Sequence, residues 1–221
     1  MSPPPERPPE RSADRRTRVR GIITLAFATV SFAASLALRD RFDPWRSTAL
    51  AAVVGMALSA WTLGPRLRPL FAVSRRGVVF AAVLGVALVA ATHAGFAVIR
   101  LISPELGRTV RGLYSSIDVG DSPALLALLA TFVVIGEELI WRGVAVAIAR
   151  SPSPSRVAIG ALSVGLYVLP QLPGHVPVLI AAATGLGAIF AAQRLVTGRL
   201  TDPIITHAIW STCVFVLLPV S

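Results

Sequence analysis

Two adjacent glutamates, Glu137 and Glu138, are the residues of this sequence best placed to do chemistry. They lie inside an apolar run from Pro123 to Ala149 that is long enough to cross a bilayer. The other nine of the eleven acidic residues lie in the N-terminal tail, in loops or at the flanks of apolar runs. Burying a carboxylate at membrane depth costs several kcal/mol, so such residues are rare and indicate a functional site.

Arg142 distinguishes the two glutamates. On an α-helix Glu138 and Arg142 are four residues apart, share a face and can pair. Glu137 points about 100° away and has no such partner on the same helix. The spacing predicts one structural glutamate and one that is available for chemistry. The alternative is that Glu138 and Arg142 only form a buried pair that holds two helices together.

The composition places these residues in a membrane protein. The 221 residues are 54% hydrophobic and 14% charged, which is not the composition of a soluble globular protein. All 21 basic residues are arginines, and they are spread over a tail and short loops between apolar runs, which argues against a nucleic-acid partner. The single cysteine, Cys213, excludes a disulfide framework and a cysteine-based zinc site.

Seven apolar runs predict an all-α, polytopic membrane helix bundle with about seven transmembrane helices. The expected spans are 21–38, 47–63, 77–102, 123–150, 157–172, 178–196 and 204–219. Residues 1–20 are rich in Pro and Arg and predict a disordered cytoplasmic tail, followed by a transmembrane domain over residues 21–221. The first half of the connection 103–122 is expected to form a short amphipathic helix at the membrane interface.

The arginines predict the orientation. With the N-terminus in the cytoplasm, the inner segments hold 14 arginines and the outer segments six, and Arg142 lies in a span. The positive-inside rule therefore predicts a multi-pass protein of the cell membrane with a cytoplasmic N-terminus and an external C-terminus.

Three short motifs in the last four spans resemble those of a known family. Glu137-Glu138-Leu-Ile-Trp-Arg142 resembles the EExxxR signature of the CPBP family of intramembrane proteases (CAAX proteases and bacteriocin-processing enzymes, also called Abi). The FxxxH motif of that family corresponds to Tyr167 through Gln171, with Tyr for Phe and Gln for His. The HxxxN or HxxxD motif corresponds to His207 through Ser211, with Ser as the last residue. The resemblance covers about residues 123–219, which would form a four-helix catalytic core.

The resemblance implies an intramembrane endopeptidase that hydrolyses a peptide bond in or near the membrane with a glutamate-activated water. Carried over by position, Glu137 would be the base, supported by Glu138 and Arg142. His207 would be an electrophilic residue or a metal ligand. Gln171 and Ser211 would take the two remaining places, where an amide and a hydroxyl can still donate hydrogen bonds. The implied partners are a membrane-associated protein or peptide substrate and the lipid bilayer.

The cofactor is left open by these motifs. A divalent metal such as zinc would have Glu137, Glu138 and His207 as ligands, whereas Gln171 and Ser211 are poor zinc ligands. The departures from the family pattern therefore weaken a metal site more than a site built on a water-activating glutamate.

Two other functions remain open. A catalytically impaired family member would keep the fold and act as a membrane scaffold or binding protein, which the missing motif-two histidine favours. A small transporter would also bury Glu, Arg and His, but it should show repeats, and none is detected. The catalytic hypothesis also carries a geometric condition. His207 lies roughly 8–10 Å lower than Glu137 on a straight helix, so the loop before it, with Asp202-Pro203, must dip into the bundle.

Overall fold

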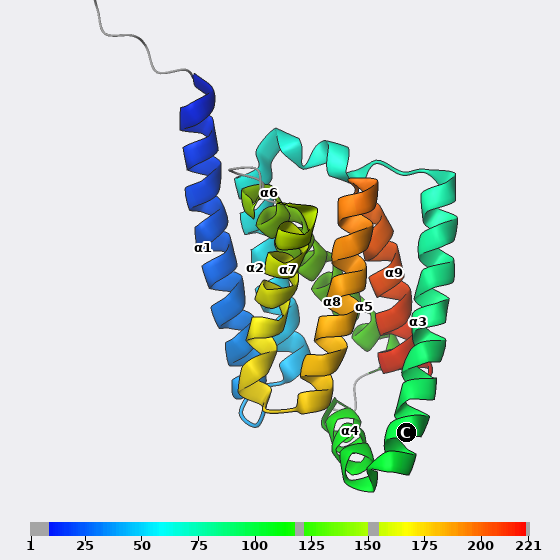
Figure 1. The fold of residues 1–221 in the computed structure, drawn as a ribbon. Helices are drawn as coiled ribbons and strands as arrows, with labels where there is room; N and C mark the ends of the chain where they lie inside the picture. The colour runs from blue at the N-terminus through cyan, green and yellow to red at the C-terminus, as the bar shows by residue number, and fades with distance from the viewer. Residues whose placement is uncertain (1–8, 118–121, 150–154, 220–221) are drawn as a thin grey trace, which may run out of the picture.

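The computed structural model of this protein describes residues 9–117, 122–149 and 155–219, and every regular element in them is a helix (Figure 1). The elements are α1 (Pro9–Ala37), α2 (Pro44–Leu63), η1 (Gly64–Arg66), η2 (Arg68–Phe71), α3 (Arg75–Ile102), α4 (Pro104–Ile117), α5 (Pro123–Glu137), η3 (Glu138–Val144), α6 (Ala145–Ala149), α7 (Arg156–Val168), η4 (Leu169–Gly174), α8 (Pro177–Thr197), α9 (Thr201–Thr212) and η5 (Cys213–Leu217). The expected all-α bundle is confirmed.

Six helical stretches in the described residues are long and apolar enough to cross a membrane, and a seventh is shorter. They are Arg15–Ala37, Pro44–Arg66, Arg75–Ile102, Pro123–Ala149, Arg156–Gly174, Pro177–Thr197 and the shorter Thr201–Leu217. Each begins within a few residues of a predicted span, apart from the first, which starts earlier. The predicted interfacial helix is present as α4, at the lower end of the bundle (Figure 1).

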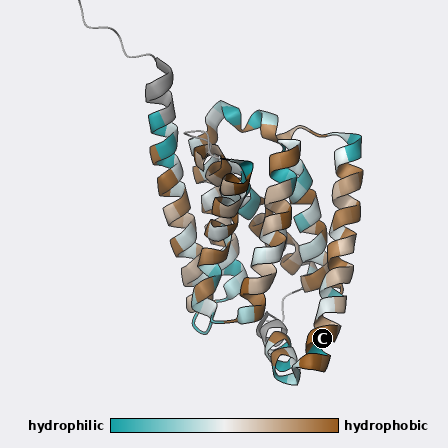
Figure 2. Cartoon of the chain, in the orientation of Figure 1, coloured by the Kyte–Doolittle hydropathy of each residue, from teal (hydrophilic) through white to brown (hydrophobic). Residues whose placement is uncertain are grey.

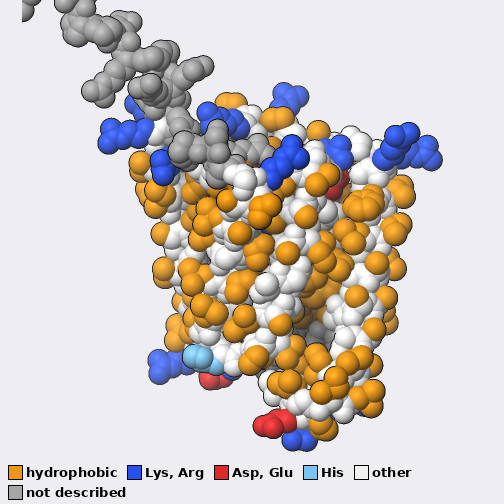
Figure 3. Space-filling model, in the orientation of Figure 1, with side chains coloured by type: hydrophobic (Ala, Val, Ile, Leu, Met, Phe, Trp, Pro, Cys, Tyr) orange, Lys and Arg blue, Asp and Glu red, His pale blue; other side chains and the backbone are white. Residues whose placement is uncertain are grey.

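The outer surface of the bundle is apolar along its height (Figures 2 and 3). Large aliphatic side chains point outward from several helices, and Leu101, Val157 and Val196 are 79–85% exposed. A soluble domain would not expose apolar surface on this scale, whereas the hydrocarbon core of a bilayer accepts it. Arginines gather at the end of the bundle where α1 begins (Figure 3).

Short polar residues set where several helices begin. The side chains of Asp43, Ser74, Ser122 and Ser155 each accept a hydrogen bond from a backbone N–H of the first helical turn of α2, α3, α5 and α7. Such caps satisfy donors that have no partner inside the helix. Proline occupies the first turn of α2, α5 and α8, where its missing N–H costs nothing.

The N-terminal segment differs from the expectation. Residues 9–20, which the sequence places in a disordered tail, continue α1 as a helix in the structure, and residues 1–8 lie outside the described part. Between Glu10 and Arg20 the chain has no glycine or proline, so nothing in this stretch stops a helix that already spans the membrane from extending beyond it.

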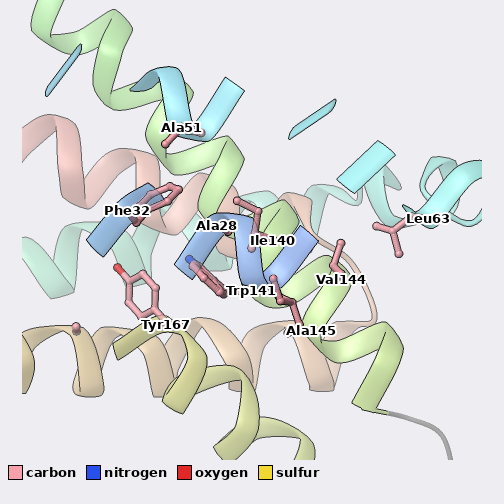
Figure 4. Packing of buried hydrophobic residues seen from close by; sticks show 12 residues of the cluster. Ala28, Phe32, Ala51, Leu63, Ile140, Trp141, Val144, Ala145 and Tyr167 are labelled. Atoms are coloured by element: carbon pink, nitrogen blue, oxygen red, sulfur yellow. The ribbon is translucent and has the colours of Figure 1, made fainter. Parts of the chain in front are cut away.

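A tightly packed core joins α1, α2 and α7 to the segment that carries the two glutamates (Figure 4). Trp141 is 1% exposed and packs edge to face against Phe32 of α1, with ring centroids 6.2 Å apart. Ile140 and Val144 are fully buried in the same cluster. Because neighbouring helices enclose this segment, its polar side chains cannot reach lipid.

The chain enters α9 from inside the bundle. Gly198 ends α8 with a φ of 72°, a left-handed conformation that glycine adopts without strain. The N–H of Leu200 then donates to the carbonyl of Leu70 at 2.7 Å, and the hydroxyl of Thr201 donates to the carbonyl of Ala72 at 2.8 Å. Leu200 is fully buried and Asp202 is 1% exposed. The inward dip required by the geometric condition is therefore present.

Candidate active site

The two glutamates lie at a change of helix type. Glu137 is the last residue of α5, and Glu138–Val144 form a π-helical turn, in which all seven residues are buried. Such wide turns often occur at functional sites. Gly136 just before it packs against α2, where a Cβ would lie 2.7 Å from the Cβ of Ala52. Only glycine permits this approach, which holds the acidic segment against α2.

Glu138 and Arg142 form the predicted pair. Arg142 Nη1 lies 3.3 Å from Glu138 Oε1, and both side chains have no exposed surface. Arg142 also donates through Nη2 to the carbonyl of Gly187 at 3.2 Å. Its guanidinium lies over the ring of Tyr167 at 4.4 Å and over that of Phe190 at 5.4 Å. The charge is held by a carboxylate, a carbonyl and two aromatic faces, as a buried arginine requires.

His207 connects the pair to α9. Its Nδ1 lies 2.9 Å from Glu138 Oε1, so the carboxylate accepts the Nδ1 proton and directs Nε2 to the other side of the ring. The ring is 2% exposed and stacks on Phe190 with centroids 4.5 Å apart and an interplanar angle of 23°. A carboxylate on one nitrogen and an aromatic ring on one face fix the orientation of the imidazole.

The second glutamate faces the free nitrogen of that imidazole. Glu137 Oε2 lies 3.8 Å from His207 Nε2, which is too long for a direct hydrogen bond. The carboxylate is also hydrogen-bonded with the hydroxyl of Tyr167. A water in the adjoining cavity can hydrogen-bond to both groups, since they lie too far apart to bond to each other directly. Glu137 therefore has partners on α7 and α9 and none on its own helix, as its position predicts.

A cavity of about 190 Å³ opens beside these groups. Its polar lining comes from Glu137, Tyr167, Gln171, His207 and Ser211. The rest of its wall is apolar, and its volume exceeds the roughly 30 Å³ that one water occupies. Four of the six predicted site residues thus line one space. The other two, Glu138 and Arg142, do not line the cavity. Glu138 contacts His207 and Arg142 contacts Tyr167, and both of these partners line it.

Gln171 and Ser211 stand where the motif comparison places them. Gln171 is half-buried in the short 3-10 helix η4, and Ser211 is 5% exposed one turn after His207 on α9. Neither residue is displaced from the cavity by its departure from the family pattern. Both side chains bring a hydrogen-bond donor to the lining.

Several contributors to the site were not foreseen. Tyr167 entered the motif comparison only as a replacement for phenylalanine, yet it contacts both Glu137 and Arg142. Phe190 stacks on His207, and Arg194 Nε donates to the carbonyl of Arg142 at 3.1 Å. Ser163 donates to the carbonyl of Trp141 at 2.7 Å. The only signal in the sequence was the hydroxyl that Tyr167 adds where the motif has phenylalanine.

The side chains fit a metal ion poorly. Catalytic zinc takes three protein ligands and a water. Glu138 Oε1 is engaged by Arg142 and by His207 Nδ1, away from the cavity, which leaves Glu137 and His207 Nε2 to face it. In the described part of the chain, no group of three or more His, Cys, Asp or Glu residues is arranged to hold a metal. Metal binding by Glu137, Glu138 and His207 stays a prediction.

Residues 120–213 match a family model described as "Rce1-like: Type II CAAX prenyl endopeptidase Rce1-like". The matched segment contains all three motifs and every residue of the candidate site, and it confirms the resemblance to the CPBP family. No curated protein and no solved structure matches the chain. The apolar helices indicate a multi-pass membrane protein, and residues 120–213, somewhat less than half of the chain, are similar to this endopeptidase family.

Proposed function

Because residues 120–213 match a family of membrane endopeptidases, we propose that this protein hydrolyses a peptide bond in or near the membrane, with Glu137 as the base that activates water. One observation carries the proposal. The carboxylate of Glu137 and Nε2 of His207 face each other across 3.8 Å at the edge of a cavity inside the bundle. A base and an electrophilic group at this separation can both hydrogen-bond to one water in the cavity beside them.

The chemical step follows from this arrangement. Glu137 takes a proton from the water as the water oxygen attacks the carbonyl carbon, and the carbonyl oxygen becomes an oxyanion. When the intermediate collapses, the C–N bond breaks and Glu137 returns the proton to the leaving amine. The hydroxyl of Tyr167 hydrogen-bonds the Glu137 carboxylate and fixes the direction in which it points.

The oxyanion would meet hydrogen-bond donors on the same cavity wall. His207, when protonated at Nε2, donates from that atom, while Glu138 holds the Nδ1 proton and offsets the positive charge. The amide of Gln171 and the hydroxyl of Ser211 add two neutral donors. Arg142 does not reach the cavity, and it acts by holding Glu138 in place.

A catalytically impaired scaffold is the second candidate function. Its support is Gln171, which stands where the family motif has histidine. A scaffold would bind a membrane-associated protein in the same cavity without cutting it. The two functions differ in one respect only, namely whether Glu137 moves a proton.

Replacing Glu137 with Gln separates them. Membranes that contain the wild-type protein should yield cleaved peptide termini that are absent with Glu137→Gln, because the amide cannot accept the proton and general-base catalysis contributes roughly 10²–10⁴-fold. Terminal peptides are compared by mass spectrometry, with a prenylated CAAX peptide as the first purified probe because the family description names that activity. Glu105→Gln, which changes an exposed carboxylate on α4, is the matched control.

Equal cleavage by wild type and Glu137→Gln would refute Glu137 as the base. A complete absence of wild-type-dependent cleavage, with both variants folded and still able to bind a membrane protein, would establish the scaffold function.

We also propose that the protein lies in the cell membrane with its N-terminus in the cytoplasm. The support is the gathering of arginines at the end of the bundle where α1 begins (Figure 3). Reporter fusions at the N-terminus, in the 151–155 linker and at the C-terminus should read inside, inside and outside. An outside signal from the linker would reverse the orientation.

A further inference from the structure

A second, larger cavity of about 460 Å³ lies beside the catalytic cavity. The two spaces share five lining residues, which are Trp45, Leu179, Ala182, Trp210 and Phe215. The shared wall includes Trp210, whose indole donates to Thr92 at 2.9 Å and whose ring lies 6.1 Å from that of His207. The proposed function assigns no role to this second space, which we name the lateral cavity.

The lateral cavity belongs to one half of the membrane. It is lined by the end of α1, the beginning of α2, the last third of α3, the middle of α4, the beginning of α8, the end of α9 and η5, which lie at the same end of the bundle. The bundle surface is hollowed on the side of α8 that faces α3 (Figure 3). An apolar space that opens on this face meets lipid rather than water. Its volume is that of a small-molecule site.

Two hydrogen-bond donors in its wall lie at the interfacial end. Arg39 and Trp45 line the cavity, and Arg39 Nη1 and Trp45 Nε1 are buried with no hydrogen-bond partner among the described residues. The nearby Asp43 does not neutralise Arg39, because its carboxylate accepts from the backbone N–H of Arg46 at 2.8 Å and from Nη1 of Arg46 at 2.6 Å. Buried donors without a partner are costly, and here they point to an absent acceptor.

We propose that the lateral cavity binds one acyl chain of an anionic phospholipid, with the phosphate at Arg39 and Trp45. The apolar walls accept the hydrocarbon, and the guanidinium and indole N–H groups supply the donors that a phosphate oxygen accepts. Arginine and tryptophan at a membrane interface are suited to such a headgroup. The inner end of the chain would reach Trp210, so a bound lipid occupies the space next to the catalytic cavity.

Tryptophan fluorescence tests the site directly, because Trp45 and Trp210 both line it. The Trp61→Phe protein is used, since Trp61 is 45% exposed and would report on bulk lipid. It is reconstituted in phosphatidylcholine vesicles with a minor fraction of brominated-chain lipid, either phosphatidylglycerol or phosphatidylcholine. Brominated phosphatidylglycerol should quench at a concentration roughly fivefold lower, the ratio expected for one arginine near an anionic headgroup.

Two matched pairs of variants locate the effect. Gly95→Leu should remove the extra quenching, because Gly95 lines the lateral cavity, a Cβ there meets nothing within 4 Å, and the leucine side chain would occupy the space of the acyl chain. Gly185→Leu, equally open but outside the cavity, should leave it unchanged. Arg39→Gln should abolish the preference for the anionic lipid, whereas Arg41→Gln, an exposed neighbour, should retain it.

Equal quenching of the Trp61→Phe protein by the two lipids would overturn the proposal. It would also fail if the preference persisted in Gly95→Leu or in Arg39→Gln, or if either control lost it to the same extent.

Discussion

The two sides of the candidate site are built differently. The rear wall is buried and each of its residues contacts another helix; its members are Glu138, Arg142, Gly187, Phe190 and Arg194. The front wall lines the cavity and keeps hydrogen-bonding capacity for water or a ligand; its members are Glu137, Tyr167, Gln171 and Ser211. His207 joins them, with Nδ1 on the rear wall and Nε2 on the front.

This difference indicates that one set of residues holds the site in place and another set carries out its chemistry. A charged group in the rear wall is fixed by a partner, so its loss leaves another buried charge without compensation. A group in the front wall faces open space, so its replacement changes what can bind or react there more than it changes the fold. Substitutions in the rear wall should therefore mainly lower stability, and substitutions in the front wall should mainly lower activity.

The largest effect on stability is expected from Arg142→Ala. The change leaves Glu138 buried without its cation and removes the bond to the Gly187 carbonyl. Such a loss costs about 3–5 kcal/mol in soluble proteins. Yield and melting temperature of the purified protein should fall much further than for Glu137→Gln. Equal melting temperatures for Arg142→Ala and Glu137→Gln would contradict the proposed difference in stability between the rear and front walls.

A smaller loss should follow from Gly187→Ala. A Cβ at this position would lie 2.9 Å from Tyr167 Cδ1 and 3.4 Å from Arg142 Nη2, so the rear wall must shift to admit it. Overpacking of this kind costs about 1–3 kcal/mol. Gly185→Ala on the same helix meets nothing within 4 Å and should be neutral or slightly stabilising. Thermal unfolding of the pair measures the difference, and identical curves would show that α8 is not tightly packed there.

The smallest effect on stability is expected from Gln171→His in the front wall. Gln171 is half-buried and borders the cavity, so the free energy of unfolding should change by less than about 1 kcal/mol. The new imidazole would join Glu137 and His207 as a third zinc ligand, and zinc binding measured by titration should tighten. Leu172→His, an exposed neighbour outside the cavity, is the control. A strongly destabilised Gln171→His protein with unchanged zinc binding would contradict the proposed role of this wall.

Much of this architecture could be predicted from the sequence. The seven apolar runs predicted the helices, because length and hydrophobicity decide which segments can span a bilayer. The spacing of Glu138 and Arg142 predicted their pairing, since four residues bring two side chains to one helix face. Hydrophobic length and helical spacing are local properties of the sequence, so the packing of the helices in the bundle does not change them.

The remainder depends on contacts between distant segments. His207 reaches Glu138 because Leu200 and Thr201 are hydrogen-bonded to backbone carbonyls of Leu70 and Ala72, and no pattern in the sequence links these positions. The role of Tyr167 was likewise missed, because only the approach of α7 to α5 brings its hydroxyl to Glu137. The lateral cavity is lined by residues from α1, α2, α3, α4, α8, α9 and η5, and no sequence motif marks it.

The π-helical turn over Glu138–Val144 also limits how this chain can change in length. A π turn holds more residues than an α turn of the same helix. Deleting one residue here would let the helix close as an ordinary α-helix, and arginine three residues after glutamate would still share its face. The segments on either side would keep nearly the same relative orientation, because the π turn already holds one residue more than the α turn that would replace it. A one-residue deletion within Glu138–Val144 is therefore expected to be tolerated better than a one-residue insertion, which would rotate the segments by about 100° and turn Glu137 away from His207.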